Sequence, residues 1–156
     1  MTDVHDDAAL HVLERQVDEW LARLRSTNPS IEAVDRGDGD ELRWYVRLRG
    51  EQKEHTTVWL TLGQRTLRYE TYVMPAPLEN VVAVYELALR RNERLVGAHF
   101  AIGVEDAIFL RGELPIAAVT EPELDRVIGS LYAYVEQSFP VLIRLGYASS
   151  FADTAD

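Results

Sequence analysis

The chain has 156 residues, no cysteine and a formal net charge of −10 at pH 7. This length favours one domain with a substantial core, so we expect a single domain over residues 1–156 with frayed tails at 1–7 and 148–156. The absence of cysteine excludes thiol catalysis, zinc–thiolate sites and disulfides, and the negative charge argues against general nucleic-acid binding, which needs clustered Lys and Arg.

Nothing in the sequence predicts a membrane or secretory segment. The N-terminus is acidic and lacks the basic start and apolar core of a signal peptide. No apolar run is long enough to cross a bilayer. A chain without cysteine also needs no oxidising compartment, so we expect a cytoplasmic protein without membrane contact.

The first predicted element is a helix over residues 8–25. Its apolar residues recur at intervals of three and four, which is typical of a helix with one buried face. The segment from Ser26 to Pro29 ends the helix, because the residue before a proline disfavours the helical region. The apolar face consists of Leu10, Leu13, Val17, Trp20, Leu21 and Leu24.

Residues 42–73 predict three consecutive β-strands, preceded by a short strand at 31–34 and a turn at 35–40. Apolar side chains alternate with polar or mixed ones, and a period of two places the two sets on opposite faces of a sheet. We therefore expect a core face made by Leu42, Trp44, Val46, Leu48, Val58, Leu60, Leu62, Leu67, Tyr69, Thr71 and Val73.

A second helix is expected from Leu78 to Arg91, after two prolines that end the sheet. Its main apolar stripe should pack against the sheet, and consists of Leu78, Val81, Val82, Tyr85 and Leu89. Val84 and Leu87 fall outside this stripe. Leaving large apolar side chains in water forfeits about 1.5–3 kcal/mol each, so we expect Val84 and Leu87 to be contacts of a homodimer.

The C-terminal half predicts a hairpin and a long helix. The hairpin strands span 96–104 and 107–114, with the turn at Glu105-Asp106. Thr120 and Glu123 have the spacing of a capping box at a helix start. Pro140 should kink that helix and Gly146 should cap its end. Its core stripe is Leu124, Val127, Ile128, Leu131, Val135 and Leu142.

These elements follow the order α-β-β-β(-β)-α-β-β-α. Such an order, with alternating strands, is typical of an antiparallel sheet that has helices against one face. We therefore predict an α+β fold with an antiparallel β-sheet of about five to six strands.

The outer face of the three-strand segment is the candidate partner-binding surface. Residues 41–73 hold six basic and four acidic side chains and are the only part of the chain that is not acidic. Guanidinium groups among aromatic rings can form cation–π contacts with each other or with a guest. Alternatively, the face is solvated and its cross-strand pairs only stabilise the sheet. The candidate residues are Arg43, Tyr45, Arg47, Trp59, Arg68 and Tyr72, with Arg49 beside them.

No pattern predicts a catalytic, cofactor or metal site. The segment from Asp35 to Glu41 resembles a calcium loop, but Gly37 and Gly39 occupy the positions where ligands are required. Ser149 and Ser150 lack the surroundings of a hydrolase nucleophile. The histidines His5, His11, His55 and His99 lack the spacing of a zinc site. We expect no enzyme activity and no cofactor.

The C-terminal half resembles the YbjN family, a family of bacterial sensory transduction regulators that shares the fold of type III secretion chaperones. The resemblance runs from the helix ending in Arg90-Arg91-Asn92, through the hairpin and Leu114-Pro115, to the acidic helix start at Glu121 and Glu123. It implies no enzymatic residues. It implies a small acidic protein, often dimeric, that binds other polypeptides.

We therefore predict a non-enzymatic, chaperone-like or regulatory protein that binds another polypeptide noncovalently. The alternative is a single-stranded nucleic-acid binder in which bases stack on the Arg/aromatic face. Salt separates the two, because phosphate binding weakens steeply with salt. An enzyme for a small anionic ligand held by Arg43 and Arg47 ranks last, because no acid–base pair accompanies them.

Overall fold

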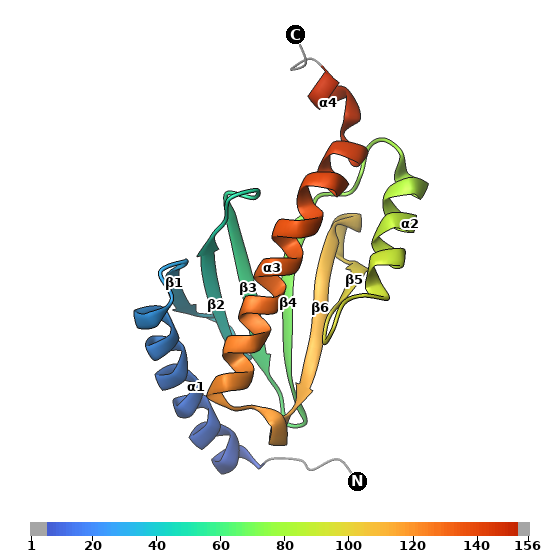
Figure 1. Cartoon of the computed structure of the whole chain (residues 1–156). Coiled ribbons are helices and arrows are strands. Elements are labelled where there is room, and N and C mark those ends of the chain that lie inside the picture. The colour runs from blue at the N-terminus through green and yellow to red at the C-terminus, as the bar shows by residue number, and fades with distance from the viewer. Residues whose placement is uncertain (1–5, 153–156) are drawn as a thin grey trace.

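The computed structural model describes residues 6–152 as one antiparallel sheet with helices on one side (Figure 1). This confirms the predicted α+β class and the order of elements. The elements are α1 Asp7–Thr27, β1 Ile31–Arg36, β2 Leu42–Arg49, β3 His55–Leu62, β4 Thr66–Met74, α2 Val81–Asn92, β5 His99–Ile102, η1 Val104–Asp106, β6 Ile108–Pro115, η2 Ile116–Ala118, α3 Glu121–Gly146 and α4 Ala148–Ala152.

The six strands lie in the order β1-β2-β3-β4-β6-β5. The first four follow the chain as a meander, β6 pairs with β4, and β5 forms the far edge. Residues 96–104 were predicted as one strand, but β5 contains only four residues, from His99 to Ile102. Gly97 has a φ of 75°, in the left-handed region, so the chain turns there instead of continuing the strand.

The core lies between the sheet and α3. Period-two alternation in the meander places Trp44, Val46 and Leu60 on the inner face, where each is almost completely buried. The long helix α3 crosses this face and buries its predicted stripe, including Leu124 and Leu131. The predicted core faces of the meander and α3 are therefore confirmed.

α1 covers the β1–β2 side of the same face, and polar contacts hold it there. The indole nitrogen of Trp44 donates to Asp18 Oδ1 at 2.7 Å. Arg36 pairs with both Asp18 and Glu14, and its guanidinium lies 4.7 Å from the centre of the Trp44 ring. The hydrogen bond to Asp18 satisfies the indole nitrogen, which is the only polar side-chain atom of Trp44. Trp44 is the largest fully buried side chain.

The ends of the chain are more ordered than predicted. Asp6 caps α1 by accepting a hydrogen bond from the Ala9 backbone at 2.8 Å. At the other end, residues 148–152 form α4. Residues 6–7 and 148–152 of the tails expected to fray thus belong to a helix or its cap, and the remaining tail residues lie outside the described part of the chain.

The two ends of α3 differ in how well they were predicted. Thr120 accepts a hydrogen bond from the Glu123 backbone at 3.3 Å, which confirms the N-terminal cap. Gly146 is not the C-terminal cap; Tyr147 is. Gly146 instead lies at a close approach: an added Cβ would lie 3.0 Å from both Met74 and Pro77.

The orientation of α2 contradicts the prediction. Val84 is completely buried and Leu87 is half-buried, whereas Leu78, Val82 and Leu89 are 75%, 78% and 67% exposed. The helix does not lie flat on the sheet; it packs on α3 and beside β5 through its narrower face. A small residue, Ala88, follows Val84 on that face and permits close packing. Val84 is therefore a core residue and not an exposed dimer contact.

Asn92, the last residue of α2, covers the free edge of β5. Its side-chain oxygen accepts from the Phe100 backbone nitrogen at 2.6 Å, and its amide nitrogen donates to the Phe100 oxygen at 3.4 Å. Both groups would otherwise face outward from the sheet, since β5 pairs with β6 on its other side. The amide thus takes the place of a neighbouring strand at this residue.

The first testable prediction concerns the dependence of the fold on α3. Leu131→Ala removes a fully buried side chain at the centre of the helix and should lower the free energy of unfolding by about 2–5 kcal/mol. Val141→Ala, on the exposed side of the same helix, is the matched control and should change it by less than about 0.5 kcal/mol. Denaturant unfolding measures both; equal effects would contradict the assignment of the buried stripe.

Candidate functional site

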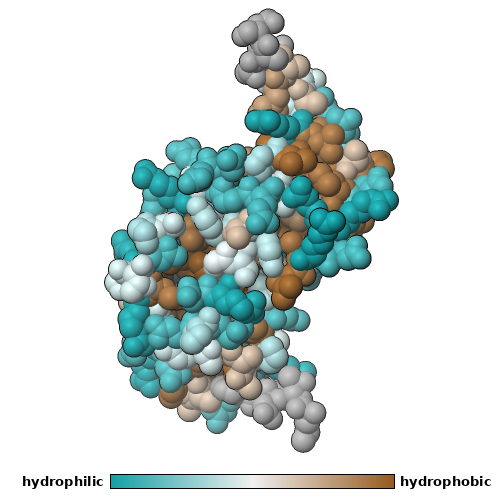
Figure 2. Space-filling view, viewed as in Figure 1, coloured by the Kyte–Doolittle hydropathy of each residue, from teal (hydrophilic) through white to brown (hydrophobic). Residues whose placement is uncertain are grey.

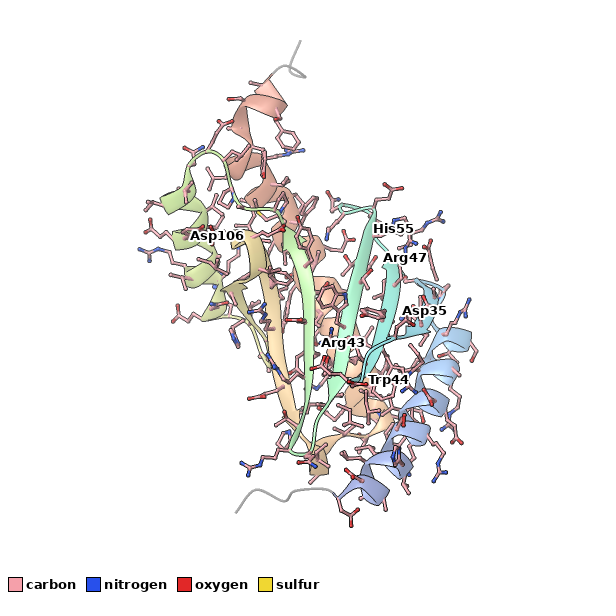
Figure 3. All side chains as sticks on the ribbon, turned by 180° about the vertical axis from the view of Figure 1, so that it is seen from behind. Asp35, Arg43, Trp44, Arg47, His55 and Asp106 are labelled. Atoms are coloured by element: carbon pink, nitrogen blue, oxygen red, sulfur yellow. The ribbon has the colours of Figure 1, made fainter. Side chains whose placement is uncertain are left out.

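The outer side of the sheet is uncovered by any helix of the described residues, and we call it the open face (Figure 3). The strand pairing places one residue from each strand in a single row across it. Arg43, Arg47 and His55 lie on this side in Figure 3. The row consists of Asp35, Tyr45, Trp59, Glu70, Arg111 and His99.

Tyr45, Trp59 and Arg43 form one cluster on the open face. The rings of Tyr45 and Trp59 meet edge to face, with centres 6.0 Å apart and planes at 85°. The guanidinium of Arg43 lies 5.9 Å from the centre of the Trp59 ring. Arg43 also donates to Thr61 Oγ1 at 3.0 Å and to Glu41 at 2.7 Å. These contacts leave all three side chains half-buried and fixed in position.

A second cluster contains residues that sequence reasoning did not assign to the site. Arg111 donates through Nε to Glu70 at 2.8 Å, and its guanidinium lies 4.8 Å from the centre of the Phe109 ring. Phe109 is buried although it belongs to the open face, and it meets Tyr72 edge to face at 5.7 Å. Only the pairing of β6 with β4 brings these residues to Tyr72, and that pairing carries no local sequence signal.

Arg47 lies in a third cluster, near the corner where β1, β2 and β3 meet. The carboxylate of Glu32 lies 3.1 Å from His55 Nε2, 3.3 Å from Arg49 Nε and 3.8 Å from Arg47 Nε. Arg47 also lies 3.2 Å from His55 Nδ1. The six predicted residues therefore share one face but divide into separate clusters, with Arg68 between the first two.

Lys53 covers Tyr72 from the β2–β3 loop. Its Nζ donates to the Tyr72 backbone oxygen at 2.8 Å and lies 4.9 Å from the centre of the Tyr72 ring. Burial lowers the pKa of Lys53 to about 8, because a charged amine loses its hydration there. Burial also raises the pKa of Tyr72 above its ordinary value. The loop is held to α3 by Glu136, which accepts the backbone nitrogens of Glu51 and Gln52.

The open face contains a polar hollow of about 220 Å³, which we call the arginine hollow. It lies where the clusters of Arg43 and Arg111 approach each other across β2, β3, β4 and β6. Two carboxylates and three guanidiniums border it, and Thr61 contributes a short side chain between them. Its charged residues are Glu41, Arg43, Arg68, Glu70 and Arg111.

A second, apolar depression of about 300 Å³ lies between α2 and the β5–β6 edge; we call it the α2 groove. Figure 2 shows hydrophobic side chains gathered over α2 and the neighbouring end of α3. Sequence reasoning missed this groove. Two of its members, Tyr85 and Leu89, lie four residues apart on α2, and the sequence placed them on the face toward the sheet. The groove is lined by Tyr85, Ala88, Leu89, Phe100, Ala101, Ile102 and Ile108.

The remaining sequence candidates take part in local contacts. Ser149 donates its backbone nitrogen to Glu79, His11 pairs with Glu14, and His5 lies outside the described residues. Between residues 6 and 152, no three His, Asp or Glu side chains gather in the manner of a metal site. None of the helices in that range combines the length and apolarity needed to cross a membrane.

The second testable prediction concerns Lys53, the only lysine in the sequence. Its pKa is about 8 in the folded chain and 10.5 ordinarily, so between these values the unfolded chain binds more protons. Stability must then rise with pH across that window. Lys53→Met removes this contribution. The free energy of unfolding of the wild type minus that of the variant should therefore increase from about pH 8 to about pH 10.5.

The single lysine makes the measurement direct. Lysine-specific isotope labelling gives one side-chain resonance, whose titration by NMR should have a midpoint near pH 8. Unfolding curves of wild type and Lys53→Met across the same pH range supply the second readout. A midpoint near 10.5, with parallel stability curves, would contradict the burial of this amine.

Comparison with known proteins places the chain in a family. Residues 15–144 match the YbjN family model, described as "Putative bacterial sensory transduction regulator". The uncharacterized protein Rv0487 of Mycobacterium tuberculosis (strain ATCC 25618 / H37Rv) is 37% identical over 105 residues, which cover 67% of this chain and 57% of that protein. The uncharacterized protein ML2442 of Mycobacterium leprae (strain TN) is 36% identical over 109 residues, 70% of this chain and 59% of that protein.

These figures also show that the chain spans less than two thirds of the length of the curated relatives it matches. The family match nevertheless extends from the middle of α1 almost to the end of α3, and so includes the whole sheet. It confirms the resemblance noted from the C-terminal half of the sequence. The chain belongs to the YbjN family.

Proposed function

We propose that this protein is a non-catalytic regulatory or chaperone-like protein that binds another polypeptide noncovalently on its open face. The observation that carries the proposal is the Tyr45–Trp59–Arg43 cluster, three half-buried and mutually fixed side chains on a face without a helix. Aromatic residues and Arg concentrate binding energy at the centres of interfaces. Their fixed positions reduce the entropy lost on binding.

Charge supports a protein partner over a nucleic acid. The whole chain carries a net charge of −10, which repels a polyanion at long range. On the open face itself, Arg43, Arg111 and Arg47 are already paired with carboxylates. Arg43 also lies over the Trp59 ring, on which a base would have to stack. A polypeptide segment with aromatic and acidic residues complements this surface without requiring many free cations.

The third testable prediction is that the open face selects peptides. Peptides enriched from a random phage-displayed library on wild-type protein should bind Trp59→Ala and Arg47→Glu about tenfold more weakly, because each variant removes an interface anchor. Fluorescence anisotropy with labelled peptides measures the affinities. Thermal unfolding of the same variants shows that the loss is not due to unfolding.

Arg94→Glu supplies the matched charge-reversal control, because Arg94 is exposed beyond α2 and lies away from the open face. Peptide affinity for this variant should equal that of wild type. A labelled oligo(dT) strand tests the alternative. The proposed ligand would be a single-stranded nucleic acid, and not a polypeptide, under three conditions. No peptide is enriched, oligo(dT) binds with a steep salt dependence, and Trp59→Ala abolishes that binding.

We also propose that the protein is a homodimer formed through α2. Val84 is buried and Leu87 half-buried, so we place the contacts on the exposed stripe of Val82 and Leu89 on α2, with Leu78 just before the helix. Beside this stripe, Glu86 and Arg90 pair with each other at 2.9 Å, so the face adds no net charge. Two acidic molecules can approach there with less repulsion than elsewhere. A two-fold pair would bury both stripes and both α2 grooves together.

The fourth testable prediction follows from this assembly. Leu89→Glu should convert a dimer to a monomer, because it places a charge at the rim of the α2 groove. Val12→Glu, on the exposed side of α1, is the matched control and should stay dimeric. Light scattering coupled to size-exclusion chromatography gives the mass. A wild-type protein that is monomeric at high micromolar concentration refutes the proposed dimer.

A further inference from the structure

We infer that the arginine hollow is a recognition site for a single carboxylate, supplied by the polypeptide that the open face binds. This inference rests on the proposed function and gives it a chemical specificity. The ligand group is an acidic side chain or a C-terminal carboxylate of the partner. The residues that would hold it are Arg43, Arg68 and Arg111, from three different strands.

Two of the three guanidiniums are held in place before any ligand arrives. Arg43 is fixed by Thr61, Glu41 and the Trp59 ring. Arg111 is fixed by Glu70 through its Nε and by the ring of Phe109. Their side chains are only 29% and 33% exposed, so their charges are less screened than those of exposed arginines.

Arg68 differs from the other two. It lies between them in register, opposite Thr61 on β3 and Glu113 on β6. Of the three guanidiniums, only those of Arg43 and Arg111 make ion pairs with described residues. Arg68 is exposed and its planar, forked donors match the two oxygens of a carboxylate.

The charge of the hollow sets the charge of the ligand. Three guanidiniums and two carboxylates line it, which leaves one positive charge in the lining, and Glu113 lies opposite Arg68 next to that lining. One carboxylate neutralises that charge. A phosphate carries about −1.5 to −2 at pH 7 and would leave the hollow negative beside Glu41 and Glu70. The short side chain of Thr61 leaves space between the arginines for the incoming group.

The hollow is also continuous with the surface proposed to bind the partner. Arg43 is shared, because it borders the hollow and lies over the Trp59 ring. A segment with an aromatic or aliphatic residue next to an acidic one would therefore contact Trp59 and the hollow together. The hollow fixes the register of that segment, as charged groups do in other interfaces.

The test uses small probes that carry one group each. N-acetyl-glutamate α-methylamide presents a side-chain carboxylate, N-acetyl-glycine a terminal one, N-acetyl-glutamine methylamide a neutral isostere, and inorganic phosphate the competing anion. The readout is the Nε–Hε NMR signals of Arg43 and Arg111 in wild-type protein at constant chloride. We expect saturable shifts with one or both carboxylates, no saturation with the glutamine probe, and weaker binding of phosphate.

Arg68→Gln should weaken carboxylate binding about tenfold, because it removes the unpaired charge-assisted donor. Arg94→Gln is the matched control and should bind as wild type does. The two carboxylate probes distinguish an acidic side chain from a chain end. Equal shifts with the glutamine probe, tighter binding of phosphate, or unchanged affinity in Arg68→Gln would each overturn the inference.

The outcomes are separable from those of the proposed function. If library peptides bind the open face but neither contain a required carboxylate nor respond to Arg68→Gln, the function stands and the hollow has no such role. If the hollow binds carboxylate probes but no peptide is enriched, the site stands and polypeptide binding fails.

Discussion

The structure depends on the burial of one helix against one side of one sheet. α3 crosses the inner face at its centre, and its stripe from Leu124 to Leu142 fills the space above β3 and β4. α1 then occupies the β1–β2 side, where Asp18 binds the indole of Trp44. No room remains on the sheet for α2. It packs on α3 at the β5 edge, and Val82 and Leu89 stay outside the core.

The open face compensates for the missing second layer with its own side chains. Long arginine side chains lie beside aromatic rings, so that their methylene groups cover apolar surface while their charged ends reach acidic partners. Phe109 becomes buried in this way without any helix above it. The same packing that protects the face also fixes the positions of its arginine and aromatic side chains.

Local sequence patterns were sufficient to predict most of the fold. Alternation in residues 42–73 and the stripes of α1 and α3 are short-range signals, and each was read correctly because one face of each element is buried. The N-terminal cap of α3 is equally local. Residues 31–34 were also recognised as a strand, although β1 continues to Arg36.

The wrong predictions concern positions whose structure is determined by contacts between distant parts of the chain. α2 has apolar residues over a wide arc, and the larger stripe appeared to be the buried one. Its position beside α3 and β5 selects the smaller face of Val84 and Ala88 instead. Gly146 resembled a helix cap, but its role is set by a segment some seventy residues earlier in the chain. The arginine hollow needs the registers of β2, β3, β4 and β6 together, so only its members Arg43 and Arg68 were recognised.

The amide of Asn92 has a consequence for how copies of this chain can assemble. A free edge at β5 would offer unpaired backbone groups to a strand of another molecule, which is a route to aggregation. Asn92 occupies the outward hydrogen-bonding groups of Phe100, so the sheet is terminated at that edge by its own side chain. Strand-to-strand addition through β5 is blocked at this residue.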